Sequence, residues 1–375
     1  MRLLMLIVWS CLSLGMTTPV PHHAEKEFLY VGSFASRGSE GLYVFRFDRT
    51  TGRLSRVQAL SDGKSPNFLA ISPDKKHLYA IYDRGPQEQG GNVTAYRIDP
   101  MSGMLDKLND QPCGGRGPAH VSVDPLGRFV YVSNYGSGTL AVYPVRQDGS
   151  LAEATQVIQD KGSGPHPNQR GPHVHSAIPS RDGKFLYVCD LGIDKVLVYR
   201  VGGDGKLTEV SAFTSRPGAG PRQFAIAPDG QSAYLVEELI SHLVSFSRDT
   251  ATGALTAGQH FAMLPEGYEE RGSDATVFVS PDNQFVYATN WGPKGISVYR
   301  IGQPGQLTLV QHADIHGAHP RDICIDQKGQ YVFVANMGSD ELTVLKRDPH
   351  TGILTYSGEQ AQVPAVSCIV QLFLP

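Results

Sequence analysis

The sequence lacks the features that mark several common classes of protein. It has no extended run of lysine or arginine, and its formal net charge is −3 with a pI near 6.5, so it carries no electrostatic footprint for nucleic acid. No two cysteines have the C-x-x-C spacing, so neither zinc nor a dense disulfide framework is indicated. The cysteines beyond the N-terminal segment are Cys113, Cys189, Cys324 and Cys368, and three of them lie in strand-like runs, where buried free thiols are expected.

The apolar run at the N-terminus, from Leu3 to Leu14, is too short to span a bilayer. Arg2 precedes it and small residues follow, as in a secretory signal peptide, which we place at residues 1–18 with an uncertain end. Cys11 is expected to be an ordinary cysteine of this segment, because the bulky Trp9 makes a poor lipoprotein box. The prediction is a periplasmic or secreted protein, or a cytoplasmic one if this is no signal.

Glycine and proline are abundant, at 41 and 25 residues, while only 18% of residues are charged, which is typical of a globular chain with many turns. The triplet Gly-x-Leu occurs seven times, at spacings of 46 to 56 residues. The glycines are Gly52, Gly103, Gly149, Gly205, Gly253, Gly305 and Gly352. A period of this length indicates a repeat architecture.

Each repeat predicts four antiparallel strands. An alternating strand such as NVTAYRID precedes each Gly-x-Leu turn, and a hairpin such as FLAISPDKKHLYAIYD lies upstream in all repeats but the first. FLYVGSF, from Phe28, resembles a second strand without a first, and the C-terminal AVSCIVQLFLP resembles a first strand without a second. We therefore predict an all-β, seven-bladed β-propeller over residues 25–375, with the C-terminal strand completing the N-terminal blade.

Candidate site residues are those that differ between repeats at equivalent positions. A proline opens six of the first strands, at Pro66, Pro118, Pro172, Pro221, Pro320 and Pro364, and is therefore assigned to turn chemistry. The start of the first strand and the end of the second lie at the same end of a blade, near the central channel. The variable polar residues there are His120, His173, His175, Asp190, Arg222, Glu237, Glu238, Arg321 and Asp83. A polar cluster of mixed charge at one channel mouth is typical of a ligand site.

Several of these residues also have structural interpretations. His173 and His175 point to the same side of a strand, either to the channel or into a hydrogen bond with a neighbouring blade. Together with Asp190 they could hold a metal, but no further ligand follows at a recognisable spacing, and none is predicted. Arg222 could be an architectural partner of Glu238 or could recognise an anion.

The chain resembles the lactonase family of seven-bladed propellers, which includes 6-phosphogluconolactonases and fungal carboxymuconate cyclases. The motifs that carry the resemblance are GPHVHS from Gly171, CDLGID from Cys189, GPRQ from Gly220, EEL from Glu237 and SNYGSG from Ser133. The resemblance implies that His175, Arg222 and Glu238 are the catalytic residues. The other residues selected above are expected to bind substrate.

Three motifs depart from the family pattern. GPRH reads GPRQ, NEL reads EEL, and the NRG expected near the sixth second strand reads Asn290-Trp291-Gly292. The missing arginine weakens the expectation of a phosphate site. An export signal also conflicts with 6-phosphogluconolactone, which is made in the cytosol, so that either the substrate differs or the segment is no signal.

The expected reaction is hydrolysis of a sugar lactone by water, without a cofactor, with His175 or Glu238 as base and Arg222 on the oxyanion. The same groups permit lactone formation or opening on an unsaturated diacid, as in the cyclases. Two further hypotheses are a non-catalytic propeller that binds a ligand or a protein, and a calcium-dependent lactonase using Glu238, Asp190, Asn134 and Asn290. The expected partner is a small-molecule sugar lactone, with no nucleic acid and no membrane span.

Overall fold

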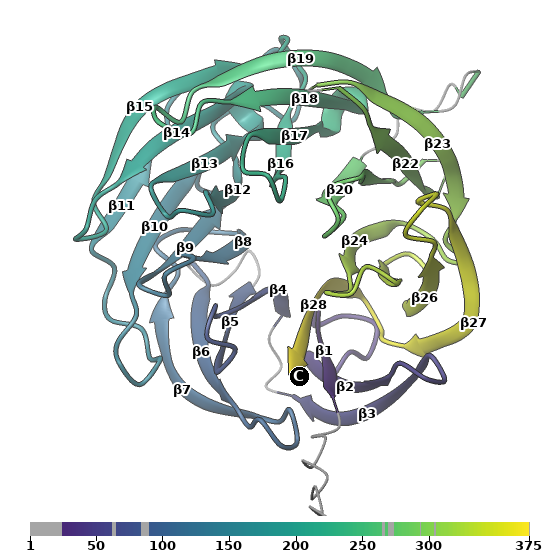
Figure 1. The fold of residues 1–375 in the computed structure, drawn as a ribbon. Helices are drawn as coiled ribbons and strands as arrows, with labels where there is room; N and C mark the ends of the chain where they lie inside the picture. The colour runs from purple at the N-terminus through teal and green to yellow at the C-terminus, as the bar shows by residue number, and fades with distance from the viewer. Residues whose placement is uncertain are drawn as a thin grey trace, which may run out of the picture.

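The computed structural model describes residues 25–374 apart from 62–64, 84–89, 265–266, 269–273, 293 and 304. The predicted signal peptide lies outside the described residues. Across the described ranges, 28 strands form seven antiparallel sheets of four strands each. Figure 1 shows these sheets arranged as blades around a central axis, with one strand of each blade innermost. The predicted seven-bladed propeller is confirmed.

The blades are numbered 1 to 7 along the chain, starting with the blade that contains both termini of the described chain. The innermost strands are β28 (Val366–Leu374), β4 (Ser65–Ile71), β8 (Pro118–Val123), β12 (Val174–Pro179), β16 (Pro221–Ile226), β20 (Asp274–Val279) and β24 (Pro320–Ile325). The second strands are β1 (Lys26–Ser33), β5 (His77–Asp83), β9 (Phe129–Asn134), β13 (Phe185–Asp190), β17 (Ser232–Glu237), β21 (Phe285–Asn290) and β25 (Tyr331–Asn336).

The third strands are β2 (Leu42–Asp48), β6 (Asn92–Ile98), β10 (Thr139–Pro144), β14 (Lys195–Val201), β18 (His242–Arg248), β22 (Gly295–Ile301) and β26 (Glu341–Arg347). The outermost strands are β3 (Arg53–Leu60), β7 (Leu105–Pro112), β11 (Gln156–Gln159), β15 (Leu207–Thr214), β19 (Leu255–Ala262), β23 (Leu307–Asp314) and β27 (Leu354–Gln362). Two single-turn 3₁₀ helices follow the second strands of blades 4 and 5, at η1 (Leu191–Ile193) and η2 (Glu238–Ile240).

The core lies between neighbouring blades. Each blade turns alternate side chains toward one neighbour and then the other, as the period of a strand requires. Blades 4 and 5, for example, bring Phe185 and Tyr187 against Phe224 and Phe246, all nearly inaccessible to solvent. The four cysteines of the described chain are buried and free, including the three for which this is expected. Within the described ranges, no helix has the length and apolar character needed to cross a membrane.

The repeated Gly-x-Leu turn has a structural role between blades. Gly253 has a φ of +80°, which side chains disfavour, and a Cβ there would lie 2.5 Å from the Phe185 ring of blade 4. Its carbonyl accepts a 2.9 Å hydrogen bond from the hydroxyl of Tyr187. Three further tyrosines, Tyr30, Tyr79 and Tyr287, bond in the same way to Gly103, Gly149 and Gly352. The triplet thus docks each such turn on the preceding blade.

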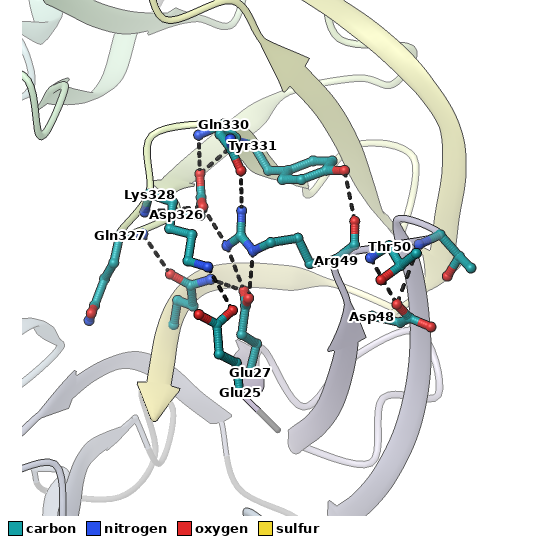
Figure 2. A network of polar contacts seen from close by, with 12 residues as sticks. Glu25, Glu27, Asp48, Arg49, Thr50, Asp326, Gln327, Lys328, Gln330 and Tyr331 are labelled. Atoms are coloured by element: carbon teal, nitrogen blue, oxygen red, sulfur yellow. Dashed lines mark hydrogen bonds and ion pairs between the residues drawn. The ribbon is translucent and has the colours of Figure 1, made fainter. Parts of the chain in front are cut away.

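The ring is closed within blade 1, where β28 pairs with β1 from Lys26↔Leu374 to Ser33↔Val366. This is the closure that the sequence predicts. A polar network reinforces it at the end of the blade where β1 begins (Figure 2). Arg49 binds both oxygens of Glu27, at 2.6 and 2.8 Å, and reaches Asp326 of blade 7 at 2.6 Å. Gln371 of β28 donates to the same Glu27 at 2.9 Å.

Candidate active site

A β-bulge near the start of each innermost strand creates the candidate site. In blade 5, Pro221 pairs with Glu237 and Gln223 with Val236, so Arg222 is an extra residue between two ladder positions. The corresponding residues in the other blades are Asn67, Ala119, His175, Arg321 and Ser367, with residues 275–276 in blade 6. A bulge redirects the side chain of its extra residue. Three of the predicted site residues, His175, Arg222 and Arg321, therefore occupy one equivalent position.

This register corrects the placement of two prolines. The sequence analysis places Pro172 and Pro364 at the start of their strands, whereas the strands begin at Val174 and Val366. Val174 pairs with Asp190, as Pro221 pairs with Glu237, so His175 and not His173 is the equivalent of Arg222.

A second set of residues lies at the same end of the blades, each directly after the second-strand residue that pairs with the residue before the bulge. Its members are Phe34, Asp83, Tyr135, Leu191, Glu238, Trp291 and Met337. The backbone of this position is anchored to the segment before the bulge, as in the 2.9 Å bond from Glu238 N to Gly220 O. Because both sets lie where first strands begin and second strands end, their side chains meet near the axis.

Arg222 and Glu238 are the central pair. Arg222 Nε lies 2.7 Å from Glu238 Oε2, with side-chain exposures of 6% and 18%. The Nε–H does not point along this line, so the contact is an ion pair and not an aligned hydrogen bond. The Arg222 guanidinium also lies 5.8 Å from the centre of the Trp291 ring. Glu238 thus keeps an exposed edge while a buried cation neutralises it.

His175 is buried next to this pair, and its Nδ1 has no hydrogen-bond partner among the described residues. Burial, followed by the charges of Arg222, Arg321 and His120, lowers the pKa of His175 well below its usual value. The ring is therefore neutral at pH 7. It meets Tyr135 edge to face, at 5.7 Å and 81°.

Two further predicted residues join the group. His120 is buried against Phe68, with ring centres 4.5 Å apart, and burial with the charge of Arg222 lowers its pKa to about 3. Arg321 stacks over Phe34 at 5.0 Å, and burial, followed by the charge of Arg222, lowers its pKa to about 10, so it stays cationic at neutral pH. We call His120, His175, Arg222, Glu238 and Arg321 the axial cluster; two cations, one carboxylate and two neutral imidazoles make it attractive to an anion.

His173 and Asp190 lie behind the axial cluster. The His173 ring stacks on Tyr135 at 4.3 Å and 14°, and its Nδ1 lies 2.8 Å from the Tyr135 carbonyl. Asp190 is fully buried and accepts the backbone N–H groups of His173 and Gly192, at 2.7 and 2.8 Å. Asp190 thus fixes the backbone of His173, while the His173 ring stacks on Tyr135.

The two remaining predicted residues occupy different places. Glu237 pairs with Pro221, and its fully buried carboxyl lies near Ser215 and Arg216 of the loop after blade 4; burial raises its pKa. Asp83 holds the position of Glu238 in blade 2, and its charge acts on the thiol of Cys113, which directly follows β7 of the same blade. Glu237 and Glu238, the consecutive acids of the EEL motif, therefore have different surroundings: Glu237 lies near Ser215, and Glu238 contacts Arg222.

Sequence reasoning missed the aromatic residues that support the axial cluster and one buried acid. Tyr135, Trp291 and Phe34 each contact a histidine or arginine of the cluster. Asp322, beside Arg321, is buried and accepts the N–H of Ile369 at 3.0 Å; burial raises its pKa to about 7. The variation between repeats at the position after the second strand was the available signal for the aromatic residues.

The side chains considered for a metal site are only partly engaged by other residues. Among the residues that the structure describes, no three histidine, cysteine, aspartate or glutamate residues are grouped to hold an ion. Asn134 donates to the Cys113 carbonyl at 2.8 Å, and Asn290 donates to Ser297 Oγ at 2.7 Å. These bonds use the amide nitrogens, whereas the Oδ1 atoms, which a calcium ion would bind, have no donor among the described residues.

Comparison with known proteins agrees with the fold. The family model described as "Lactonase, 7-bladed beta-propeller" matches residues 28–371. A protein of Bacillus subtilis named 6-phosphogluconolactonase is 34% identical over 341 residues, which cover 91% of this chain and 97% of that protein. An uncharacterized protein of Lactococcus lactis is 32% identical over 348 residues, covering 92% of this chain and 100% of that one.

Among solved structures, the periplasmic gluconolactonase of Pseudomonas aeruginosa superposes with a TM-score of 0.87 at 31% identity, covering 94% of this chain and 99% of that one. Both matches extend over nearly the whole propeller. The chain belongs to the lactonase family of seven-bladed β-propellers.

Proposed function

We propose that the protein hydrolyses the 1,5-lactone of a sugar acid at the axial cluster. The observation that carries this proposal is the Arg222–Glu238 contact of 2.7 Å, beside a neutral buried histidine and a second guanidinium. Family membership and the names of the Bacillus and Pseudomonas relatives support the reaction class.

The reaction needs one base and one site for the oxyanion. We assign the base to Glu238, because its carboxylate is the anionic group of the axial cluster and keeps an exposed edge. It takes a proton from water as the water oxygen bonds to the lactone carbonyl carbon. When the tetrahedral intermediate collapses, the bond from that carbon to the ring oxygen breaks, and the departing alkoxide takes the proton back from Glu238.

The cations and the imidazole have complementary roles in this proposal. Arg222 orients Glu238 and, with Arg321, stabilises the negative charge that develops on the carbonyl oxygen. His175, neutral at pH 7, accepts a hydrogen bond from the attacking water or from a sugar hydroxyl. His120 and His173 line or support the same region and are assigned to substrate binding together with Arg321.

The substrate we favour is the unphosphorylated lactone, acted on outside the cytoplasm. Trp291 stands where the family pattern has an arginine, which removes one cation from the site. The predicted export segment and the periplasmic gluconolactonase of Pseudomonas point the same way. A 6-phosphate remains the alternative, and Arg321 is the residue that would receive it.

The deciding measurement is acid release by the mature chain from glucono-1,5-lactone, its 6-phosphate and an aromatic-pathway lactone, compared with spontaneous opening. We expect the highest kcat/KM on glucono-1,5-lactone. Glu238→Gln should reduce kcat by about 10²-fold or more, which is the range of a lost general base. Arg53→Ala removes an exposed arginine on the outermost strand of blade 1 and should leave the rate unchanged.

Each other result has a definite meaning. Preference for the phosphorylated lactone would overturn the substrate assignment, and preference for the aromatic-pathway lactone would favour the cyclase-type reaction. No turnover of any lactone would reject the hydrolase and favour a propeller that binds ligand without catalysis. Full activity of Glu238→Gln would move the base to His175.

A further inference from the structure

Two buried carboxyl groups lie behind the axial cluster, where blades 3 and 4 meet. Asp190 ends β13 of blade 4 and is fully buried. Asp160 follows β11 of blade 3, is 9% exposed, and is fixed by the 3.1 Å hydrogen bond from its own N–H to the carbonyl of Gly138. The two carboxyl groups lie close enough to interact directly across the interface between the blades.

Two oxygen atoms of this pair lack a hydrogen-bond donor. Asp190 Oδ1 accepts two backbone N–H groups, but Asp190 Oδ2 and Asp160 Oδ2 have no donor among the described residues. Two ionised carboxylates in contact and out of water would repel each other strongly. A single proton between them supplies the missing donor and removes one of the two charges.

The proton belongs with Asp160. Asp190 has backbone donors that favour its charged form, whereas Asp160 has the neighbouring carboxylate to bind. Burial, followed by the bond to Asp190 and its charge, raises the pKa of Asp160 to about 8. Coupled carboxyl pairs that share a proton behave in this way.

Asp190 connects the carboxyl pair to the candidate active site through its hydrogen bonds to the backbone. Its Oδ1 holds the backbone of His173 and caps η1 through Gly192. The His173 carbonyl in turn accepts the N–H of Leu191 at 3.0 Å, so the turn and the strand start are tied together. His173 stacks on Tyr135, and Tyr135 contacts the edge of His175.

We propose that Asp160 and Asp190 share one proton and act as a positioning pair, which fixes His173 and Tyr135 behind His175 and makes lactone hydrolysis fall reversibly when that proton is lost in mildly alkaline solution. The inference rests on the proposed function for its activity readout. Neither residue touches substrate in this arrangement, so both are positioning residues.

The charged and titratable groups around the pair come from three directions. Glu209 of β15 adds negative charge, which favours the shared proton, while Lys195 of β14 opposes it. His173 faces Asp190 and favours its charged form. Burial, followed by the charges of Asp160, Glu209 and Asp190, raises the pKa of Tyr199 of β14. Burial, followed by the charge of Glu238 and with a smaller effect of Asp190, raises the pKa of Tyr135 of blade 3. One cation among these groups does not offset two adjacent carboxylates.

The test compares Asp160→Asn with the wild type and with Glu153→Gln, which removes an exposed carboxyl of blade 3. The amide keeps a neutral donor at position 160 at every pH. We expect wild-type kcat/KM to fall with an apparent midpoint near the Asp160 pKa of about 8. Asp160→Asn should match the wild type within about twofold at pH 7 and retain activity at least one pH unit further, since a neutral bond replaces a neutral bond. Glu153→Gln should behave as the wild type.

Two further measurements do not depend on turnover. Relative to Asp160→Asn, the wild type should lose stability to urea as pH rises from about 4 to about 8, because the unfolded carboxyl ionises first while the folded one keeps its proton. In ¹⁵N-histidine-labelled protein, the His173 ring signal, assigned by its absence in His173→Gln, should shift across the same alkaline range in the wild type but not in Asp160→Asn.

An alkaline limb that is unchanged in Asp160→Asn would overturn the proposal, as would a pH-independent stability difference between the two proteins. If the wild type hydrolyses no lactone, the proposed function fails, while the urea and NMR arms still decide whether the pair shares a proton and positions His173.

Discussion

Tyr135 is the residue on which two histidines of the site meet. One face of its ring carries His173 at 4.3 Å, and His175 approaches it edge-on at 5.7 Å. The tyrosine lies at the position that Glu238 holds in blade 5, so it fixes histidines where another blade presents a reactive group. Its ring is therefore a support for the chemistry and not a source of it.

Replacing Tyr135 by Leu tests this role. We expect a fall in kcat/KM of about 10-fold or more, because the His175 ring loses the contact that holds its orientation. The fold should survive, since the position is only partly buried. The matched control is Tyr356→Leu, which removes an equally close Tyr–His stack, with His316 at 4.2 Å, far from the axis. Equal losses of activity in both variants would refute the assignment.

The buried histidines predict how stability depends on pH. His120 has a folded pKa of about 3 against an unfolded value near 6.5, so the unfolded chain binds an extra proton as pH falls between these values. Stability should therefore decrease on acidification, by about 1.4 kcal/mol per pH unit for this residue. His120→Asn should show a correspondingly shallower decline in urea denaturation between pH 6.5 and 4.5. An unchanged slope would mean that His120 is charged in the folded state.

At the scale of elements, the contribution of the Gly-x-Leu turn to stability can be tested by a glycine-to-alanine substitution, which adds one methyl group. Gly253→Ala adds a Cβ that would lie 2.5 Å from the Phe185 ring, at a φ of +80°. We expect a loss of about 2–4 kcal/mol, from backbone strain and from overpacking together. Gly38→Ala is the matched control, because its φ is +82° but nothing lies within 4 Å of the added Cβ, so it should cost about 1 kcal/mol. Similar costs at both positions would show that the contact between blades adds nothing.

The elements also show where sequence reasoning succeeds and where it stops. The turn triplets and alternating strands have a period that one sequence reveals, so the number of blades and their closure by β28 were predictable. A bulge depends on which residue of the partner strand lies opposite, and this pairing leaves no mark in the alternation. His173 and His175 therefore looked equivalent, although only His175 is the bulged residue.

The direction in which a side chain points at the end of a strand could not be predicted from the sequence either. Glu237 and Glu238 are adjacent and chemically identical, yet one is buried near the loop after blade 4 and the other pairs with Arg222. The contribution of Asp160 could not be predicted because it comes from the segment after the outermost strand of the neighbouring blade, 30 positions before Asp190 in the chain.

The propeller is closed by the pairing of β1 with β28, the first and last strands of the described chain. Arg49 links β1 to the neighbouring blade 7. Its guanidinium contacts Glu27 of β1 and Asp326 of blade 7, whose side chains are 3% and 0% exposed. Glu27 in turn accepts from Gln371 of β28. The network drawn in Figure 2 lies where β1 begins. Ser33 ends the same strand, so the axial cluster lies at the opposite end of the blades.

Arg49→Ala should consequently separate stability from catalysis. Removing the cation leaves two buried carboxylates without their partner, which typically costs about 3–5 kcal/mol. Arg56→Ala is the matched control, because it breaks an ion pair with Glu40 in which both side chains are largely exposed, and such pairs contribute about 0–1 kcal/mol. We expect urea denaturation to shift strongly for the first variant and little for the second, with kcat/KM of both near the wild-type value below the transition. The contrary result would be a loss of activity in Arg49→Ala without a loss of stability. The Arg49 network would then control the geometry of the axial cluster at the opposite face, and the propeller would not be a rigid frame for its site.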